Sequence, residues 1–298
     1  MPDLAHDFPG PGLAAVLRRA AQELRAAGVD TPGDDARRLV AAALGASEVE
    51  LLRRPERVLS PEEGERLRGF VARRVAREPV SRIVGSREFY GRSFALSPAT
   101  LDPRADSETL IEAALGLVRE EGWEGKSLRI LDVGTGSGCL LLTLLAELPS
   151  ATGVGTDISE AALEVASENA HRLGLADRCR WLACDLMSGV GGRFDLVVSN
   201  PPYVPTVAIA TLEPEVRLFD PPAALDGGSD GLRFFHRLAT GIPDLNPGGW
   251  TVLEVGHDQA DAVIGVLAAS MPAPRRASIR VFRDVAGRRR CVAMRTRN

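Results

Sequence analysis

Cysteine, histidine, lysine and aromatic residues are scarce in this 298-residue chain, in which Lys126 is the only lysine. The four cysteines have no C-x-x-C spacing and the four histidines are scattered, so we expect neither a disulfide framework nor a bound metal. No apolar run is long enough to span a bilayer, and the N-terminus has no basic stretch leading into an apolar one. We therefore expect a cytoplasmic protein without membrane association.

A strong net charge is also missing, because 36 basic residues face 40 acidic ones and leave a formal charge of -4. This balance argues against a protein that coats duplex nucleic acid by charge alone, so we expect no stable DNA binding. The exception is the segment 274–298, which has nine arginines and a single acid, Asp284. This segment is either a solvated edge or a surface for RNA or another acidic partner, and both interpretations stay open.

The first part of the chain, residues 1–78, is rich in Ala, Leu and Arg and places apolar residues at intervals of three to four. This spacing predicts a small all-α bundle with Asp34 and Ser60 as helix caps. Residues 79–103 then carry short aromatic runs broken by turns, which predict a linker with a small hairpin about Gly91. The predicted helices of the bundle cover residues 13–24, 36–44 and 62–75.

The remaining part, residues 104–298, alternates strand-like and helix-like segments. Such alternation predicts an α/β fold with a mostly parallel sheet, right-handed crossovers and helices on both faces. The last two strands are joined by a short turn and read as an antiparallel hairpin at one edge. The predicted strands cover residues 128–133, 153–156, 194–199, 250–255, 279–282 and 290–294, and the predicted helices among them include 107–118, 139–147 and 159–173.

A glycine loop, Gly134-Thr135-Gly136-Ser137-Gly138, joins the first of these strands to a helix. Glycines let the backbone approach a ligand closely, and open α/β sheets bind ligands at the carboxyl ends of their strands. A dinucleotide site would need the pattern G-x-G-x-x-G, but the third glycine comes one residue early and Cys139 follows it. The spacing therefore disfavours a dehydrogenase.

Three acids sharpen the choice of cofactor: Asp132 is on the end of the first strand, Asp157 ends the second, and Asp185 lies in the loop before the next. Asp132 beside the loop would repel a pyrophosphate but suits the cationic amino acid end of S-adenosyl-L-methionine. Asp157 can accept both ribose hydroxyls, which fits NAD and S-adenosylmethionine equally. Asp185 can accept from an adenine amino group while Leu186 packs on the ring. Each acid alone could be a loop or cap residue, but together with the glycines they favour S-adenosylmethionine.

The segment Asn200-Pro201-Pro202-Tyr203 leaves another predicted strand at the same edge. Prolines end strand pairing, which is a structural reason for them, but they also form a stiff turn with carbonyl acceptors and no N–H donors. If the Asn200 oxygen and the Pro201 carbonyl each accept one N–H, a planar NH2 is held with its lone pair toward the methyl donor. Both dipoles stabilise the charge that develops on nitrogen. Tyr203 is expected to stack on the planar group.

The glycine loop and the turn resemble those of amino-group methyltransferases, and the flanking motifs narrow the resemblance to the peptide chain release factor N5-glutamine methyltransferases, the HemK/PrmC family. This resemblance implies a class I (Rossmann-like) S-adenosylmethionine-dependent methyltransferase domain over 104–298. It also implies that the glutamine of the Gly-Gly-Gln motif in class 1 release factors is the substrate, that Asn200 to Tyr203 contact it, and that the helical domain helps dock it. The resemblance further implies that Gly134 to Gly138, Asp157 and Asn200 bind the cofactor. The motifs that carry the resemblance include Glu88–Gly91, Pro103-Arg104, Asp106–Glu108, Glu215–Arg217 and Ala286–Arg288, with Ser107 in place of a family threonine and Leu186 where some relatives have tryptophan.

Two other functions stay open. An N6-adenine or N2-guanine nucleic-acid methyltransferase would use the same turn on a base amino group, and only the arginine-rich C-terminal segment offers it a surface. A non-catalytic S-adenosylmethionine-binding or translation-adaptor protein, with the helical domain as its working part, would not need the Asn-Pro-Pro-Tyr turn. The preferred hypothesis remains an enzyme that supports translation termination by methylating a protein glutamine.

Overall fold

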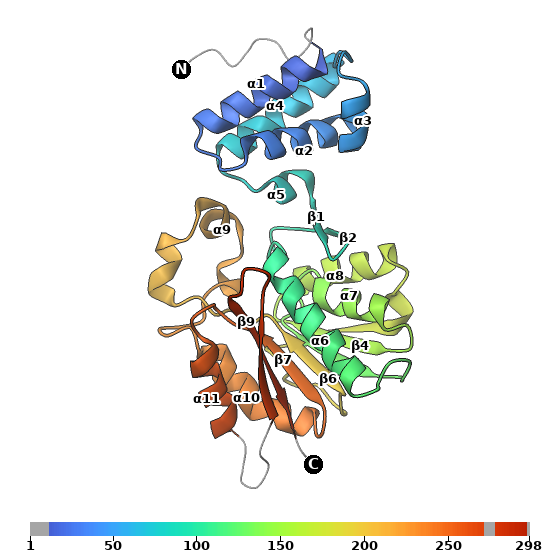
Figure 1. The fold of residues 1–298 in the computed structure, drawn as a ribbon, viewed down its shortest axis with the longest axis vertical. Helices are drawn as coiled ribbons and strands as arrows, with labels where there is room; N and C mark the ends of the chain where they lie inside the picture. Colours follow the sequence, from blue (N-terminus) through green and yellow to red (C-terminus); the bar gives the residue numbers. More distant parts are fainter. Residues whose placement is uncertain (1–11, 271–277, 297–298) are drawn as a thin grey trace. The chain divides into compact units, whose positions relative to one another are not determined.

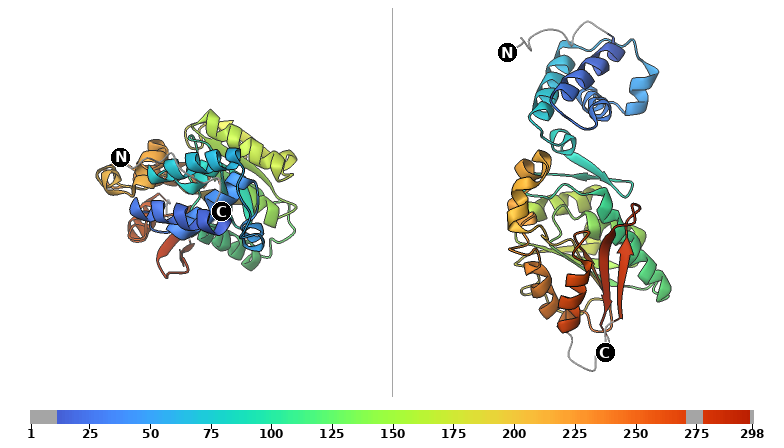
Figure 2. Two further views of the ribbon diagram at one scale, coloured as in Figure 1. Left: turned by 90° about the horizontal axis from the view of Figure 1, so that it is seen from above. Right: turned by 60° about the vertical axis from the view of Figure 1, so that its left-hand side comes forward.

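The computed structural model describes residues 12–270 and 278–296. The chain divides into two compact units, which Figures 1 and 2 show from three directions. One unit spans Met1–Gly85 and Glu213–Phe219, and the other spans Ser86–Leu212 and Asp220–Asn298. In the described residues no helix has both the length and the apolar character needed to cross a membrane.

The first unit is a bundle of short helices. Apolar residues at helical spacing bury one side of each long helix, as Val16, Ala20 and Leu24 do in α1. The Ser60 side chain accepts from the Glu63 N–H and caps α4, as predicted. The prediction for Asp34 was wrong, because Pro32 starts α2 earlier and leaves Asp34 in the first turn. The helices of this unit are α1 (Leu13–Ala26), α2 (Pro32–Leu44), α3 (Glu48–Arg53), α4 (Pro61–Val75), α5 (Val80–Val84) and α9 (Pro214–Phe219).

A helix from much later in the chain, α9, belongs to this unit because of a buried ion-pair network. Glu215 of α9 accepts from Arg74 at 2.9 Å and from Arg77 at 2.7 Å. Arg74 also donates to Asp35 at 2.7 Å, and the side chains of Arg74 and Asp35 are less than a tenth exposed. The network therefore joins α2, α4 and the residues after α4 to α9.

The second unit contains a small hairpin and a large twisted sheet. Strands β1 (Ser86–Phe89) and β2 (Arg92–Ala95) pair antiparallel around Tyr90 and Gly91, both of which have positive φ. In the described residues the large sheet has the order β5-β4-β3-β6-β7-β9-β8, in which β9 pairs antiparallel with β7 and with β8. Its strands are β3 (Arg129–Val133), β4 (Thr152–Asp157), β5 (Cys179–Ala183), β6 (Leu196–Ser199), β7 (Trp250–Glu254), β8 (Ser278–Arg283) and β9 (Arg289–Arg295).

Helices cover both faces of this sheet (Figure 1). On one face α6 (Glu108–Glu120), α7 (Cys139–Glu147) and α8 (Glu160–Arg172) pack on side chains such as Ile130 and Val198. On the other face α10 (Arg233–Leu245) and α11 (Ala260–Ala269) pack on the alternate side chains, such as Leu131 and Val197. Because strands β3 and β6 are buried on both faces, they read as unbroken apolar runs in the sequence.

The predicted α/β fold with its antiparallel C-terminal hairpin is confirmed. The turn of that hairpin is held by Asp284, whose carboxylate accepts from the N–H groups of Ala286 and Arg288. Strand β5 was not predicted, because it lies at the open edge of the sheet and keeps most of its side chains partly exposed, so it lacks an apolar run. The division of the chain at residues 78 and 103 stays a prediction.

Candidate active site

The glycine loop lies between β3 and α7, as its sequence predicted. Gly134, Gly136 and Gly138 all have positive φ, which glycine adopts without strain. The N–H groups of Gly134 and Thr135 donate to the Thr156 carbonyl at the end of β4. A Cβ on Gly138 would come within 3.2 Å of the Ala166 Cβ in α8, so a side chain there would press on a neighbouring helix. The loop is therefore folded tightly against the carboxyl ends of two strands.

Beneath the loop, the Asp132 side chain is fully buried. The Thr135 hydroxyl donates to its Oδ2 at 2.6 Å, whereas Oδ1 has no hydrogen-bond partner. Burial raises the pKa of Asp132 to about 7, and the Thr135 hydrogen bond only partly offsets this. A buried carboxylate oxygen without a partner is costly, and a bound ammonium group would satisfy it.

The other two acids lie at the ends of the next strands. Asp157 accepts from the Gly136 N–H and the Ser159 N–H, both at 2.9 Å, so its carboxylate is held rigidly beside the loop. Asp185 forms an ion pair with Arg237 at 2.7 Å and is half exposed. Leu186, which has a positive φ, accepts from the Thr156 hydroxyl through its carbonyl.

The turn Asn200–Tyr203 begins directly after β6. The Ser199 hydroxyl donates to the Val133 carbonyl at 2.7 Å and joins the ends of β6 and β3. The Asn200 Nδ2 donates to the Ser107 Oγ at 3.3 Å. The Tyr203 hydroxyl donates to the buried Glu254 at 3.2 Å, and burial is the main reason that the pKa of Tyr203 is raised. Glu254 had not been singled out in the sequence.

A cavity of about 630 Å³ at this edge of the sheet brings most of the predicted residues together. The predicted residues that line it are Gly134, Thr135, Gly136, Ser137, Asp157, Asp185, Leu186, Asn200 and Pro202. Four others do not line it: Asp132 and Gly138 lie in and under the loop, and Pro201 and Tyr203 lie in the turn. The stacking predicted for Tyr203 stays a prediction, and in this structure its ring packs with the core cluster beneath α10 and α11.

Sequence reasoning missed the opposite wall of the cavity. Ser107 comes from the start of α6, and Phe234 comes from α10. Ser107 was named only as part of a motif that carries the resemblance, and Phe234 was not named. Neither residue belongs to a pattern whose spacing indicates chemistry. The remaining wall residues are Ala99, Leu101, Pro103, Ile209, Pro221, Pro222, Ala223, Ala224, Asp226 and Arg233, with Cys139, Leu140, Ile158 and Ser159 near the loop.

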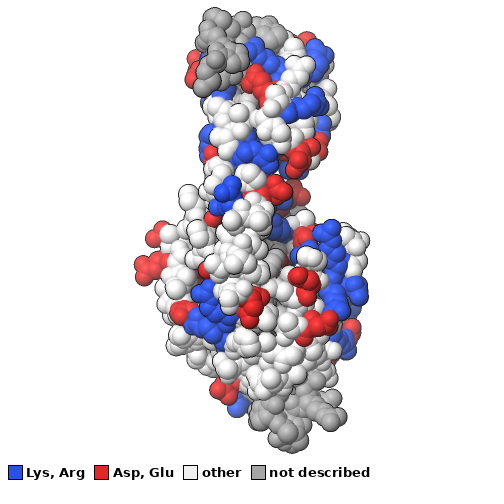
Figure 3. Space-filling view, turned by 90° about the vertical axis from the view of Figure 1, so that its left-hand side faces the viewer, with Lys and Arg blue, Asp and Glu red and all other residues white. Residues whose placement is uncertain are grey.

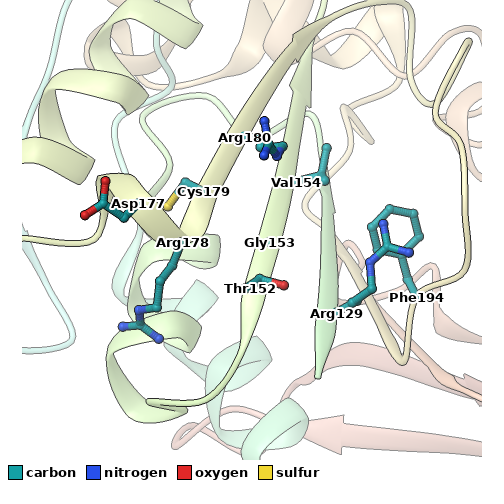
Figure 4. A pocket seen from close by; sticks show the side chains of 9 residues that line it. All are labelled: Arg129, Thr152, Gly153, Val154, Asp177, Arg178, Cys179, Arg180 and Phe194. Carbon is teal, nitrogen blue, oxygen red and sulfur yellow. The ribbon is translucent and has the colours of Figure 1, made fainter. Parts of the chain in front are cut away.

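A second cavity, of about 200 Å³, lies at the opposite edge of the sheet, at the amino ends of β3, β4 and β5 (Figure 4). Two of its arginines have structural partners: Arg178 donates to the carbonyls of Leu148, Pro149 and Ala151, and the Arg129 guanidinium lies 4.9 Å from the centre of the Phe194 ring.

The arginine-rich C-terminal segment is only partly described, because Arg275, Arg276 and Arg297 lie outside the described residues. Several of the others pair with carboxylates, including Arg289 with Asp261 at 2.6 Å and Arg295 with Glu121 at 2.7 Å. On the face shown in Figure 3, basic and acidic side chains are interspersed over each unit. Ion pairing thus reduces the local positive charge that a nucleic-acid surface would need.

Comparison with known proteins identifies the family. The family described as PrmC N-terminal domain matches residues 15–85, and the one described as Methyltransferase small domain matches residues 113–213. The release factor glutamine methyltransferase of Rhodospirillum rubrum is 46% identical over 286 residues, which cover 96% of this chain and 85% of that protein. The protein of the same name from Bradyrhizobium diazoefficiens is 45% identical over 270 residues, covering 90% of this chain and 91% of that one.

Solved structures agree on the fold. The catalytic domain of hMettl16 in complex with the MAT2A 3'UTR hairpin 6 has a TM-score of 0.56 at 17% identity and covers 70% of this chain and 77% of that one. The N-terminal domain of human METTL16 in complex with SAH has a TM-score of 0.50 at 17% identity, covering 69% of this chain and 76% of that one. The chain has the fold of a class I methyltransferase. It belongs to the release factor glutamine methyltransferase family, which confirms the predicted resemblance.

Proposed function

We propose that this protein transfers a methyl group from S-adenosyl-L-methionine to the side-chain amide N5 of the glutamine in the Gly-Gly-Gln motif of class 1 peptide chain release factors. The observation that carries the proposal is the turn Asn200–Tyr203 beside the large cavity at the carboxyl edge of the sheet. Because the chain belongs to this family, we assign the NH2 group that this turn holds to a protein glutamine and not to a nucleobase.

The residues around the glycine loop fit S-adenosylmethionine. The free Oδ1 of buried Asp132 suits the ammonium group of its amino acid end, and the rigid Asp157 carboxylate suits ribose hydroxyls. Asp185 and Leu186 line the part of the cavity that we assign to the adenine. When bound, the cofactor would supply an electrophilic methyl group: the nitrogen lone pair would form the new N–C bond, the electrons of the S–C bond would return to sulfur, and the nitrogen would lose one proton to water.

The turn after β6 positions the amide. Because the Asn200 Nδ2 donates to Ser107, the Asn200 oxygen is available to accept an N–H from the substrate. The Pro201 carbonyl accepts the second N–H, and the two prolines keep both acceptors fixed. The substrate nitrogen is thereby held with its lone pair directed at the methyl group, and both acceptors stabilise its developing positive charge. No general base is needed before transfer.

The helical unit is proposed to help dock the release factor, since its residues 15–85 match the N-terminal domain of the family. The proposed partner is therefore a protein, and no stable DNA binding is expected. A nucleic-acid methyltransferase would need a continuous basic surface, and the ion pairs of the C-terminal segment speak against one there.

The test is to incubate the protein with S-adenosylmethionine and a purified class 1 release factor and to measure the intact mass of the factor. We expect a gain of one methyl group that peptide mapping assigns to the Gly-Gly-Gln glutamine. Parallel reactions contain tRNA, rRNA or DNA in place of the release factor. Methylation of nucleic acid alone would contradict the proposal, and the absence of any transfer would favour the adaptor function.

A further inference from the structure

A buried polar chain lies behind the turn that holds the substrate amide. It begins at Asn200, whose Nδ2 donates to the Ser107 Oγ at 3.3 Å. Ser107 is 3% exposed and Glu254 is 1% exposed, and the Ser107 hydroxyl lies close enough to the Glu254 carboxylate to lower its pKa. Glu254 ends β7, which pairs with β6 along the strand that leads into Asn200. Three elements thus converge behind a single carboxamide.

The direction of the hydrogen bonds in this chain follows from the carboxylate at its end. An ionised carboxylate can only accept, so the Glu254 carboxylate draws the single hydroxyl proton of Ser107 toward it. The Ser107 oxygen is then left as an acceptor, which only the NH2 side of Asn200 can satisfy. The carboxamide oxygen consequently points to the other side, where Asn200 lines the cavity.

Other groups hold Glu254 in place. The Tyr203 hydroxyl donates to its Oε1 at 3.2 Å, while Oε2 has no hydrogen-bond partner. Arg290 of β9 adds a nearby positive charge and is itself held by Asp106 at 2.7 Å and Asp284 at 3.2 Å. A buried acid with one oxygen unpartnered costs folding free energy, so its presence here points to another role.

We propose that Ser107 and Glu254 are positioning residues that fix the orientation of the Asn200 carboxamide, so that its oxygen faces the substrate amide. Without this constraint the carboxamide can rotate by half a turn and present an NH2 group, which would repel the N–H groups of the substrate. The inference rests on the proposed function, because it concerns how the same turn holds an amide.

The pH dependence of the reaction reports on this chain. Burial raises the pKa of Glu254, although the Ser107 hydrogen bond, Arg290 and Tyr203 oppose the shift. When Glu254 is protonated it can donate to Ser107, whose proton is then free to occupy the Asn200 oxygen. We therefore expect kcat to fall on the acid side, at a pH above the usual range of a glutamate. The other titratable groups that face Glu254 are Asp106, Cys139 and Cys291, besides Tyr203 and Arg290.

The experiment compares the wild type with Ser107→Ala, Ser107→Thr and Glu254→Gln, using full-length protein and a purified release factor. We expect Ser107→Ala to lower kcat by roughly 10- to 100-fold, the cost of leaving one buried polar group unsatisfied, with KM for the release factor changed less than about threefold. Ser107→Thr keeps the hydroxyl and restores kcat to within a few-fold of the wild type. Glu254→Gln lowers kcat and loses the acid limb of the pH profile, because its neutral amide no longer dictates the direction of the Ser107 proton.

The matched control is Glu121→Gln, which also neutralises a glutamate that has hydrogen-bond partners. Glu121 follows α6 and meets Trp250 at the amino end of β7, away from the turn. It should leave kcat and the pH profile unchanged. Equal kcat values for wild type and Ser107→Ala, with methyl transfer intact, would overturn this inference alone. Failure of the wild type to methylate the release factor would instead overturn the proposed function. If Ser107→Ala does not fold, the Ser107→Thr and Glu254→Gln profiles still decide the matter.

Discussion

At the scale of single residues, Asn200 has a structural task and, in the proposed function, a chemical one. It follows β6 directly, and one side of its carboxamide is engaged by Ser107 while the residue lines the large cavity. A side chain that only ended a strand would not need both the NH2 group and the oxygen of its carboxamide. The proposed chemistry uses the oxygen, which Ser107 leaves free.

Replacing Asn200 by alanine should lower kcat for glutamine methylation by about 100- to 1,000-fold, the usual cost of removing one preorganised group that stabilises developing charge. Binding of the release factor should be nearly unchanged, because the docking proposed for the helical unit does not involve Asn200. Single-turnover methyl transfer and equilibrium binding, measured on the same preparation, separate the two quantities. Unchanged transfer in this variant would contradict the catalytic assignment of the turn.

Asp132 predicts a pH dependence of cofactor binding. Its pKa in the free protein is about 7, and a bound ammonium group favours the ionised form, so the pKa falls on binding. Affinity for S-adenosylmethionine should therefore rise with pH up to about 7 and then level off. Calorimetric titrations between pH 6 and 8 measure this, with proton release on the acid side. Asp132→Asn should bind weakly with no such slope, and an equal slope in that variant would exclude Asp132 as the titrating group.

At the scale of elements, the glycine loop depends on close packing between β3, α7 and α8. Gly138 has a φ of 79°, and a Cβ there would lie 3.1 Å from Leu142 and 3.2 Å from Ala166. The conformation and the contact both exclude larger residues. The position of the cofactor loop is thus set by a helix that follows it by more than twenty residues.

Gly138→Ala should lower the free energy of unfolding by more than the roughly 1 kcal/mol expected from a positive φ alone, and it should weaken cofactor binding. The matched control is Gly174→Ala, whose φ of 68° is similar but whose Cβ would have no neighbour within 4 Å. Chemical denaturation and calorimetry measure both effects. Equal losses of stability in the two variants would show that the contact with α8 is unimportant.

At the scale of the whole molecule, the chain leaves the sheet-containing unit after Leu212 and returns to it at Asp220. In between, α9 is bound to the helical unit by Glu215, which is 18% exposed at its side chain and meets two arginines. Residues on both sides of this excursion, Ile209 and Pro221, line the large cavity.

Glu215→Ala should lower the free energy of unfolding of the helical unit by about 3 kcal/mol at neutral pH, because Arg74 and Arg77 lose a largely buried partner. Burial acts to raise the pKa of Glu215, but the hydrogen bonds from Arg77 and Arg74 outweigh it and the pKa is lowered. The stabilisation is thus present above the ordinary glutamate pKa and is lost as the pH falls through the lowered value. Denaturation at neutral and acid pH tests both points. The more exposed pair of Arg19 and Glu23 is the control, and Glu23→Gln should change little.

The sequence by itself determined the alternation of elements and the composition of the loop and the turn. Apolar runs such as 128–133, glycines at fixed spacing and prolines after a strand are local signals, because they reflect the backbone conformation and burial of neighbouring residues. They were enough to predict the sheet, its C-terminal hairpin and the residues on the loop side of the cavity. Strand β5 escaped because an edge strand with partly exposed side chains has no such signal.

Only the tertiary structure decided which distant groups meet behind the site. Ser107, Asn200 and Glu254 lie far apart in the chain and come together because α6 begins where β6 and β7 end. The association of α9 with α2 and α4 likewise depends on Glu215 meeting Arg74 and Arg77. Neither contact leaves a pattern in the sequence, because each depends on single polar residues that are far apart in the chain. The partner of such a residue is fixed only when folding excludes water and brings one other polar group beside it.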